Sequence, residues 1–523
     1  MTIRKQIKEI IKKAVFSYAE ATEDKNFTVE IPENKEYGDY ATNVALIFSR
    51  QARDKWPNPI QLAEEIKSKI SSEMFEKIDV VNGFINFYFK PEFLQNQIKE
   101  IIKENKNYGK TNIGNGEKVQ VEFISSNPTG PLTVANGRGG PMGDVLANVL
   151  NFVGYKIKKE FYINNAGNQI AVLGHSILKD DKAQYRGGYI DSLVGRIKER
   201  DVYKAGQEAA KIIIDEMIKK TTDKFGIKYD EWFWESDLHK KDLTEKIIKL
   251  LKDKNLLYEQ DGATWFKSSS LGDNRDRVLI KKDGLKTYLA SDIAYHYNKF
   301  KERKFDKVIN IWGADHHGDV PGLMAGVEAI GYKGQLEIIL QQFITVTEKG
   351  KKIKMSKRLG TFVPMDDLLN AVGSDVVRFF FLMHSADKQM DFDMDLAKEK
   401  SDKNPVYYVQ YAYARINSIL RKTSGHNLNV KLELLNHPAE IELIKNLIAF
   451  PEIIEETAKD YQVHRLPTYA IKSAALFHRF YTECHVLGEE RDLEKARLAL
   501  IMATKIVLEN ILDLMGIGKP EKM

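Results

Sequence analysis

The stretch that most restricts the fold runs from residue 118 to residue 154, where a strand pattern leads through a Gly/Pro-rich elbow into a helix pattern. Val119, Val121 and Phe123 alternate with polar residues, which is the period of two expected of a strand. Residues 125–131 (SSNPTGP) break this pattern, and apolar residues then recur at helical spacing. A strand that enters a helix through an elbow leaves backbone N–H groups unpaired, and these can hold an anion such as phosphate.

The elbow by itself does not distinguish a phosphate site from an ordinary strand–helix connection. Residues 137–140 (GRGG) fail the dinucleotide-binding spacing, because Met142 stands where a third glycine belongs. The sequence also lacks the phosphate-loop pattern in which Gly-Lys-Ser/Thr follows a glycine after four residues. Both interpretations of the elbow therefore stay open on this stretch alone.

Length and composition indicate a globular protein of two to four domains, with 523 residues of which 43% are hydrophobic and 29% charged. The net charge of +5 permits a polyanionic partner without requiring one. The single cysteine, Cys484, excludes an internal disulfide and a multi-cysteine zinc site, and it fits a reducing compartment. Because the sequence shows no signal peptide and no run approaching roughly 18 apolar residues, we expect a soluble, cytoplasmic protein without membrane contact.

The order of strand and helix patterns predicts three domains. Residues 1–112 have the pattern of a separate α/β module. Residues 113–375 alternate strands and helices, as in a doubly wound, Rossmann-like parallel sheet, with a helix-rich insertion at about 176–262. Residues 376–523 show helical patterns only. The expected fold class is therefore multidomain α/β with a C-terminal all-α domain, and ligands should bind beyond the carboxyl ends of the sheet strands.

One strand of the first domain has two interpretations. Phe84, Asn86 and Tyr88 alternate along residues 83–89 and therefore share one face of the strand. Such an aromatic–amide–aromatic face is usually half-buried core. It can also be a stacking platform for unpaired bases of RNA, and the sequence leaves both interpretations open.

A cluster of basic residues marks a loop inside the second domain. Residues 349–358 contain six lysines and arginines, between a β-rich run and a helix pattern at 365–372. A charge run is usually a solvated turn, but this one lies within a domain, and Gly350 and Gly360 suit movement. A mobile cationic loop at the mouth of a sheet suits a substrate that gains negative charge as it reacts, above all a triphosphate.

This loop and several other short sequence motifs resemble those of a known family. Lys354-Met355-Ser356-Lys357 is similar to the Lys-Met-Ser-Lys signature of class I aminoacyl-tRNA synthetases, and the chain as a whole resembles the arginyl-tRNA synthetase family. The resemblance runs from end to end. It rests on six further words in order: 38–43 (GDYATN), 127–132 (NPTGPL), 162–169 (YINNAGNQ), 288–292 (YLASD), 313–318 (GADHHG) and 520–523 (PEKM).

The resemblance implies ATP-dependent attachment of arginine to tRNA(Arg) through an arginyl-adenylate, with bound tRNA required for activation. It implies that Glu122 and Asp292 hold the arginine side chain, and carboxylates suit a guanidinium because it is a rigid fork of donors that never loses its charge. Tyr288 stands four residues before Asp292, on the same helix face, although this spacing alone favours an ordinary surface pair. Asn127 and His316 match positions that hold the α-amino and carboxylate end.

The resemblance also implies the residues of ATP binding and catalysis. Attack of the arginine carboxylate on the α-phosphate builds negative charge, which Lys354 and Lys357 are placed to neutralise, with Mg²⁺ on the phosphates. We expect no zinc and no other protein-bound metal, because the adjacent histidines after Asp315 usually point apart. The implied ATP-binding residues are Gly313, Asp315, Met355, Ser356 and Lys357.

One word departs from the family. Its first signature usually reads His-x-Gly-His, whereas this chain has Thr133-Val134-Ala135-Asn136. Thr133 and Asn136 can donate neutral hydrogen bonds but carry no charge, and charge-assisted bonds are roughly twice as strong. We therefore include Thr133 and Asn136 among the catalytic residues but expect Lys354 and Lys357 to supply a larger share of catalysis than usual.

The resemblance names partners and leaves two alternatives. The expected partners are tRNA(Arg), arginine and ATP, and we expect a monomer in which Phe84 and Asn86 contact the tRNA elbow and the helical domain meets the anticodon. A cysteinyl-tRNA synthetase is disfavoured, because one cysteine cannot supply its zinc site. A non-catalytic paralogue that only binds tRNA or nucleotide is motivated by the altered Thr133 and Asn136, and opposed by the complete lysine loop.

Overall fold

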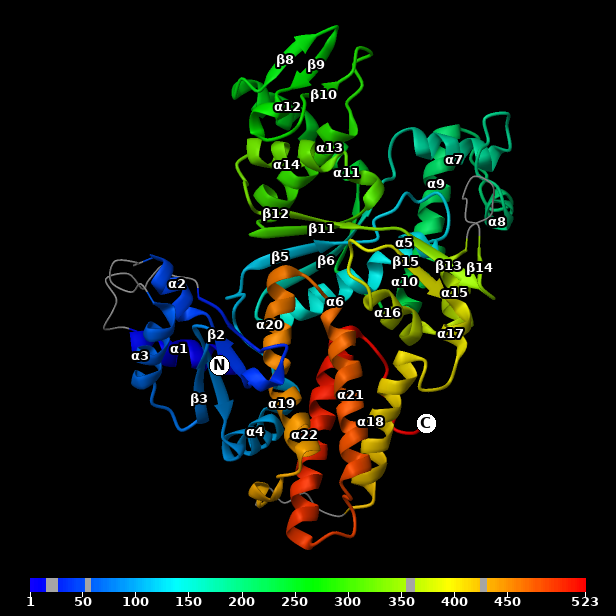
Figure 1. Ribbon diagram of the computed structural model, residues 1–523. Coiled ribbons are helices and arrows are strands. Elements are labelled where there is room, and N and C mark those ends of the chain that lie inside the picture. Colours follow the sequence, from blue (N-terminus) through cyan, green and yellow to red (C-terminus); the bar gives the residue numbers. More distant parts are fainter. Residues whose placement is uncertain (16–26, 52–57, 354–362, 424–429) are drawn as a thin grey trace.

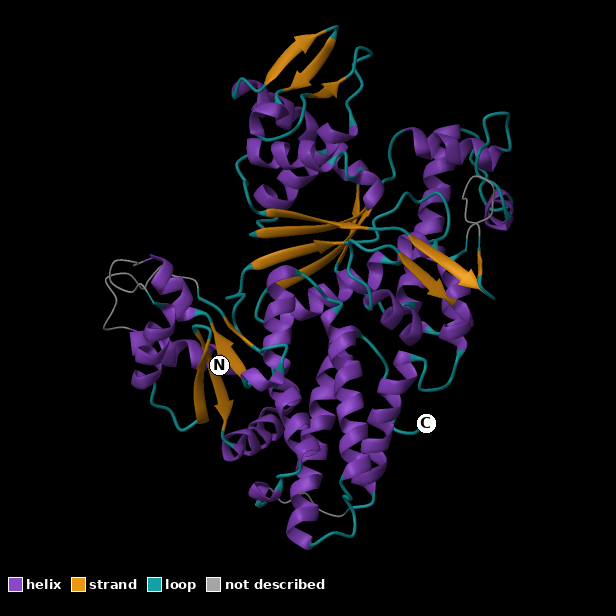
Figure 2. Ribbon diagram, in the orientation of Figure 1, coloured by secondary structure: helices purple, strands orange, loops and turns teal. Residues whose placement is uncertain are grey.

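The computed structural model describes residues 1–15, 27–51, 58–353, 363–423 and 430–523 (Figure 1). Strands gather in four sheets, and long helices fill the C-terminal part of the chain (Figure 2). In the ranges described, no helix combines the length and the apolar character needed to cross a membrane.

The N-terminal part is an antiparallel sheet with helices packed on it. The strand order is β1-β2-β4-β3, so β4 is an inner strand paired on both sides. Ile3, Ile7 and Ile11 recur at helical spacing on one face of the first helix and are buried, which explains why this lysine-rich segment is a helix of the domain rather than a solvated tail. The elements are α1 (Ile3–Val15), β1 (Val29–Glu30), β2 (Tyr40–Thr42), α2 (Val44–Gln51), α3 (Pro59–Lys69), β3 (Phe75–Val81), β4 (Phe84–Phe89) and α4 (Pro91–Glu104).

The centre of the molecule is a parallel sheet of five strands in the order β12-β11-β5-β6-β7. The chain starts at β5 in the centre and adds β6 and β7 towards one edge of the sheet. It then returns to β11 beside β5 and adds β12 at the other edge, so the strand order reverses between β5 and β11. This is the doubly wound order expected from the sequence, and the expected fold class is confirmed. The strands are β5 (Lys118–Glu122), β6 (Lys156–Ile163), β7 (Glu231–Trp234), β11 (Lys307–Gly313) and β12 (Leu336–Gln341).

The elbow and its helix follow β5 as the pattern predicts. α5 (Val134–Gly137) and α6 (Gly139–Phe152) come after the elbow, and α6 covers one face of the sheet (Figure 1). Gly143 permits a close approach, since a Cβ there would lie 2.2 Å from the Phe123 ring.

Three strands lie in stretches that the sequence patterns indicated to be helix-rich or, after residue 375, entirely helical. β7 falls inside the stretch 176–262, which is otherwise mostly helical, and it forms one edge of the central sheet. β8 (Leu257–Gln260) begins a small antiparallel sheet in the same region. β15 (Met390–Asp393) pairs with β13 (Ile344–Glu348), so strands do not end at residue 375 as expected. These strands have only four residues each, too few for their alternation to stand out among charged helices.

The remaining elements between residues 168 and 398 lie around the central sheet or belong to the small sheet of β8, β9 and β10, which stands apart from it (Figure 2). They are α7 (Asn168–Leu178), α8 (Gly188–Val194), α9 (Val202–Ile212), α10 (Lys219–Lys224), α11 (Ser236–Lys240), α12 (Leu243–Asp253), β9 (Ala263–Phe266), β10 (Arg277–Ile280), α13 (Tyr288–Tyr297), α14 (Val320–Ala329), β14 (Lys351–Lys352), α15 (Met365–Val372), α16 (Ser374–Leu382) and α17 (Met394–Lys398).

From residue 405 the described chain is a helical bundle whose long helices lie side by side (Figure 1). Gly516, with a φ of 64°, ends the last helix in the left-handed conformation. The helices are α18 (Pro405–Arg421), α19 (Pro438–Ile448), α20 (Phe450–Asp460), α21 (Arg465–Glu483) and α22 (Arg491–Met515).

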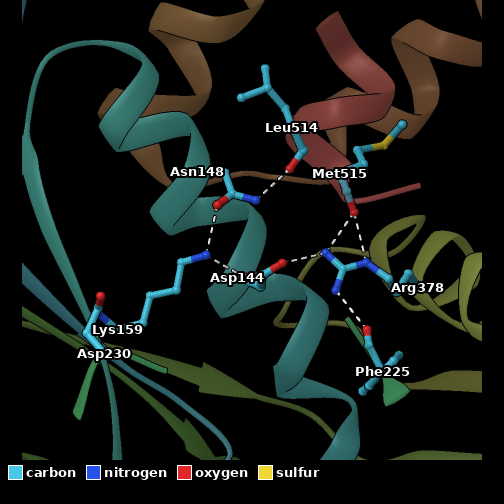
Figure 3. A network of polar contacts seen from close by, with 8 residues as sticks. All are labelled: Asp144, Asn148, Lys159, Phe225, Asp230, Arg378, Leu514 and Met515. Atoms are coloured by element: carbon cyan, nitrogen blue, oxygen red, sulfur yellow. Dashed lines mark hydrogen bonds and ion pairs between the residues drawn. The ribbon is translucent and has the colours of Figure 1, made fainter. Parts of the chain in front are cut away.

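A buried arginine joins the helical bundle to the central sheet (Figure 3). Arg378 of α16 is fully buried and donates to Asp144 Oδ2 on α6 at 2.5 Å. Its Nε and Nη2 donate to the carbonyl oxygen of Met515, at the end of α22, and its Nη1 donates to the carbonyl oxygen of Phe225. Lys159 of β6 donates to Asp144 Oδ1 from the other side at 2.6 Å. One guanidinium therefore ties the end of the C-terminal helix to the helix that follows the elbow.

We expect Arg378→Met to lower the free energy of unfolding by about 3 kcal/mol, because it removes one partner of a buried ion pair and leaves buried carbonyl groups without donors. The measurement is urea unfolding followed by circular dichroism. Arg196→Met is the matched control, because Arg196 pairs with Glu216 where both side chains are more than 40% exposed. The control should leave the midpoint unchanged, and equal shifts in both variants would contradict the structural role of Arg378.

Candidate active site

Polar side chains from several sheet strands converge at their carboxyl ends. Glu122 is the last residue of β5, and Asn310 of β11 lies opposite it in the parallel register. Asn164 directly follows β6, and Glu235 directly follows β7. Because the strand order reverses between β5 and β11, Glu122 lies at the position where a doubly wound sheet is expected to have its ligand-binding crevice.

Asp292 approaches this crevice from helix α13. It is half-buried, and Tyr288, one turn earlier on the same helix, stands 66% exposed. Burial raises the pKa of Asp292 to about 7, and the negative charges of Glu235 and Glu122 add to the rise. Glu122 and Asp292 come from distant segments of the chain. They are nevertheless close enough for the negative charge of Glu122 to raise the pKa of Asp292.

Glu235 is a site residue that sequence reasoning missed. It is 5% exposed, and burial raises its pKa to about 7. The Tyr162 hydroxyl is hydrogen-bonded to it, and the Asn164 amide, oriented so that both its atoms are satisfied, donates to Glu235 Oε2 at 2.6 Å. An acidic residue at the carboxyl end of a strand, which Glu235 after β7 shares with Glu122 at the end of β5, was the signal that could have found it.

Beneath these groups lies a layer of fully paired charges. Lys299 is completely buried and donates to Glu122 Oε2 at 2.5 Å and to Asn310 Oδ1 at 3.1 Å. Glu160 of β6, also completely buried, accepts from Arg303 Nη2 at 3.0 Å. Neither pair could be predicted from the sequence, because the partners are more than a hundred residues apart along the chain.

The charge balance of the crevice is incomplete. Glu122 and Glu160 each have a cationic partner, whereas Asp292 and Glu235 form no ion pair with any residue that the structure describes. Glu235 is buried and Asp292 is half-buried, and both have a raised pKa and no ion-pair partner among the described residues, which makes them a candidate site for a positively charged ligand.

The other residues implied for the substrate lie in the segments that follow β5 and β11. Asn127 is half-buried in the elbow, and its backbone oxygen accepts from the Thr129 N–H. His316 lies in the turn after β11 with 56% of its side chain exposed, and its Nδ1 is 3.5 Å from Asp319 Oδ2. Asp315 packs on Gly313, where a Cβ would lie 2.3 Å from the Asp315 carboxylate.

Thr133 and Asn136 are bonded to each other. The Thr133 hydroxyl donates to Asn136 Oδ1 at 2.7 Å and accepts from the Asn136 N–H at 3.3 Å, which makes a capping box at the start of α5. Thr133 is 5% exposed. The two residues thus stabilise the elbow, and only the Asn136 side chain is partly exposed.

The elbow is also fixed to the segment that follows the basic loop. The Val134 N–H donates to the Val363 oxygen at 3.1 Å, and the Met365 N–H donates to the Leu132 oxygen at 2.8 Å. Lys354, Met355, Ser356 and Lys357 themselves lie outside the described residues. Of the two described segments that flank these residues, the one that follows them, at Val363 and Met365, is bonded to the elbow.

Phe84 and Asn86 of β4 have different environments. Phe84 is half-buried, whereas Asn86 is 2% exposed and its Nδ2 finds no hydrogen-bond partner among the described residues. Tyr88, on the same face, donates its hydroxyl to the Glu36 oxygen at 2.6 Å. This face of β4 is therefore buried to the extent expected of a core face. Its one unsatisfied donor among the described residues is Asn86 Nδ2.

A search for clusters of three or more His, Cys, Asp or Glu side chains placed to hold a metal ion finds none in the described part of the chain. The His316 and Asp315 pair, at 3.9 Å, remains a contact of two exposed side chains.

Comparison with known proteins places the chain among one family. Three family profiles match it: "Arginyl tRNA synthetase N terminal domain" at residues 1–89, "tRNA synthetases class I (R), catalytic domain" at 191–394, and "DALR anticodon binding domain" at 409–523. Arginine–tRNA ligase from Carboxydothermus hydrogenoformans is 43% identical over 97% of this chain and 96% of its own length. The Bacillus subtilis arginine–tRNA ligase is 42% identical over the full length of both chains.

Solved structures give the same result. An arginyl tRNA synthetase from Campylobacter jejuni is 32% identical with a TM-score of 0.76, covering 83% of this chain and 100% of its own. The Thermus thermophilus arginyl-tRNA synthetase covers 100% of both chains with a TM-score of 0.81, and at 22% identity it shows the shared fold alone.

We expect Asp292→Asn to stabilise the folded protein at pH 7.5 by about 1–3 kcal/mol. A carboxyl group whose pKa is raised by folding stays protonated in the folded chain while it is ionised in the unfolded chain, so it destabilises the fold increasingly as the pH rises from about 4 to about 7. Asparagine has no such equilibrium. Urea unfolding at pH 4 and 7.5 checks this, and the two proteins should be alike at pH 4. Asp181→Asn, on the surface, should change nothing, and an Asp292→Asn variant less stable than the parent at pH 7.5 would contradict the pKa.

Proposed function

The chain belongs to the arginyl-tRNA synthetase family of class I, and from that premise we propose that it is an arginine–tRNA ligase, which uses ATP to attach arginine to tRNA(Arg) through an arginyl-adenylate. The family excludes the cysteinyl alternative. A paralogue without catalytic activity is the remaining rival, and the experiment below addresses it.

The observation that supports arginine as the substrate is the uncompensated charge of Asp292 and Glu235 beside Glu122. A guanidinium offers five donors in a plane and keeps its charge at any physiological pH, so it can bond several carboxylates at once. Binding such a cation stabilises the ionised form of Asp292 and Glu235 and removes the electrostatic cost that burial imposes on them. A neutral or acidic side chain would leave that cost in place.

The rest of the amino acid should bind at the rim. We assign Asn127 and His316 to the α-amino and carboxylate end of arginine, and Tyr288 to the outer part of its side chain. These positions suit the task because they lie where β5 and β11 end and where α13 begins, with partly or largely exposed side chains. The arginine carboxylate would then face the elbow.

ATP would lie between the elbow and the turn after β11. We assign Gly313 and Asp315 to ATP, together with Met355, Ser356 and Lys357 of the loop. An oxygen of the arginine carboxylate attacks the α-phosphorus, the bond from this phosphorus to the bridging oxygen breaks, and pyrophosphate leaves. Lys354 and Lys357 would neutralise the charge that develops, with smaller contributions from Thr133 and Asn136, and ATP would enter as its Mg²⁺ complex.

The transfer step uses the tRNA. A hydroxyl of its terminal ribose attacks the carbonyl carbon of the adenylate, and AMP leaves. We propose domains at 1–112, 113–375 and 376–523, in which the first contacts the tRNA elbow and the last the anticodon. Phe84 and Asn86 are the proposed contacts in the first domain, and this assignment is supported by Asn86 Nδ2, a donor without a hydrogen-bond partner among the described residues. We further propose a monomer in the cytoplasm.

Aminoacylation of total tRNA, tested with each of the twenty amino acids in turn, should give charging with arginine alone. Pyrophosphate exchange with arginine should require added tRNA. No charging with any amino acid would establish the non-catalytic alternative. Robust exchange without tRNA would overturn only the proposed requirement for tRNA.

The altered first signature predicts an unequal division of catalysis. Lys357→Ala should lower the adenylation rate about 100-fold, because it removes a charged donor from the developing charge. Thr133→Ala should lower it about tenfold, since it removes a neutral donor and one half of the capping box. Thr133→Ser keeps the hydroxyl and should retain nearly full rate in single-turnover assays. A larger loss in Thr133→Ala than in Lys357→Ala would contradict this division.

A further inference from the structure

A chain of buried polar side chains links the carboxylate of Glu122 to the backbone of Asp292, two residues that we assign to arginine binding. It begins at Glu122 Oε2, which accepts from Lys299 Nζ at 2.5 Å. Lys299 also donates to Asn310 Oδ1 at 3.1 Å, and Asn310 Nδ2 lies 2.9 Å from His296 Nε2. The chain ends where His296 Nδ1 lies 2.7 Å from the backbone oxygen of Asp292. The four side chains are at most 4% exposed.

The hydrogen bonds of this chain have one consistent direction. A carbonyl oxygen only accepts, so His296 donates from Nδ1 to Asp292, and its Nε2 accepts from the Asn310 amide. Asn310 then presents its oxygen to Lys299. Burial and the nearby Lys299 charge hold the pKa of His296 well below its usual range, which keeps the imidazole in the neutral form that this direction requires.

The chain crosses the point where the strand order reverses. Glu122 ends β5, Asn310 lies beside it on β11, and Asp292 and His296 are on α13. Lys299 follows in a π-helical turn, Asn298–Glu302, in which one extra residue is accommodated and the side chains shift relative to an α-helix. The lysine therefore fixes the helix that carries Asp292 to the strand that carries Glu122.

We propose that Lys299 is a positioning residue for the arginine substrate, which orients the Glu122 carboxylate by binding Oε2 and sets its place relative to Asp292. This inference rests on the proposed function. Within the described chain, Glu122 Oε1 accepts no hydrogen bond, so it is the oxygen left for a guanidinium. The Lys299 ammonium also favours the ionised form of Asp292, and thereby lowers the pKa of that carboxyl group.

A buried ion pair can also be a purely structural element, and removing one partner then costs stability alone. The two roles differ in what they change. A structural role alters stability and impairs arginine and ATP binding together. A positioning role alters arginine binding selectively, and it moves the pH dependence of that binding because the removed charge acts on Asp292.

The test compares Lys299→Met, Glu122→Gln and the double variant with the parent chain, in tRNA charging assays from pH 6 to 9. Lys299→Met should raise the KM for arginine at least about tenfold and change the KM for ATP less than about twofold. The pH at which arginine binding is half-maximal should move upward, because Asp292 loses the ammonium that favours its ionised form. At pH 9, where Asp292 is ionised, the arginine KM of the double variant should be no higher than that of Glu122→Gln alone, because Lys299 then acts on arginine through Glu122.

The inference is overturned if folded Lys299→Met keeps the arginine KM and pH profile of the parent, if the KM values for arginine and ATP rise together, or if the two substitutions are additive. Should Lys299→Met not fold, Lys299→Gln decides, since it keeps a side chain that can donate to Glu122 Oε2 and removes the positive charge. A severalfold rise in the KM for arginine without a rise in the KM for ATP, together with an upward shift of the pH profile, supports the inference, and the parent's KM and pH profile overturn it. A parent protein that charges no arginine overturns the proposed function itself and this inference with it.

Discussion

The reversal of strand order between β5 and β11 is the constraint on which the rest of the site depends. Parallel strands present their carboxyl ends at one edge, and at the reversal no crossover helix covers that edge. Glu122 and Asn310 face each other across it, and Glu235 arrives from the end of β7. Without this geometry the carboxyl groups would lie on separate surfaces, where solvent would screen them from one another.

The site is built so that its own charges do not cancel. The lower layer is neutral, because Lys299 pairs with Glu122 and Arg303 pairs with Glu160. The upper layer keeps Asp292 and Glu235 without a cation among the described residues, and burial raises both pKa values to about 7. The folded protein therefore gives up some stability at neutral pH to hold a place for a cationic substrate, as functional sites commonly do.

The same helix that follows the elbow connects the site with the distant end of the chain. α6 begins just after the Thr133–Asn136 cap and carries Asp144, which Arg378 joins to the end of α22. The last helix of the anticodon-binding profile thus contacts, through one buried guanidinium, the helix that supports the elbow. The end of the helical bundle is therefore in direct contact with the helix that follows the elbow.

Local patterns were enough to predict the main features of the fold. Alternation at 118–123, the elbow, and helical periodicity in α6 identified the central strand–helix unit, because each depends only on neighbouring residues. β7 and β15 were missed, since four residues carry too little periodicity. Within the site, the resemblance to a family implied roles for Glu122 and Asp292. Glu235 and Lys299 belong to none of the motifs on which that resemblance rests.

The sequence alone therefore determined the fold class, the family and the kind of ligand, because periodicity and signature words are local properties of the chain. Only the tertiary structure decided which charges are paired. Whether Glu122 is already bonded to Lys299, and whether Asp292 and Glu235 lack a cation, depends on contacts between segments more than fifty residues apart. Burial then sets the cost of each charge, and burial exists only in the folded chain.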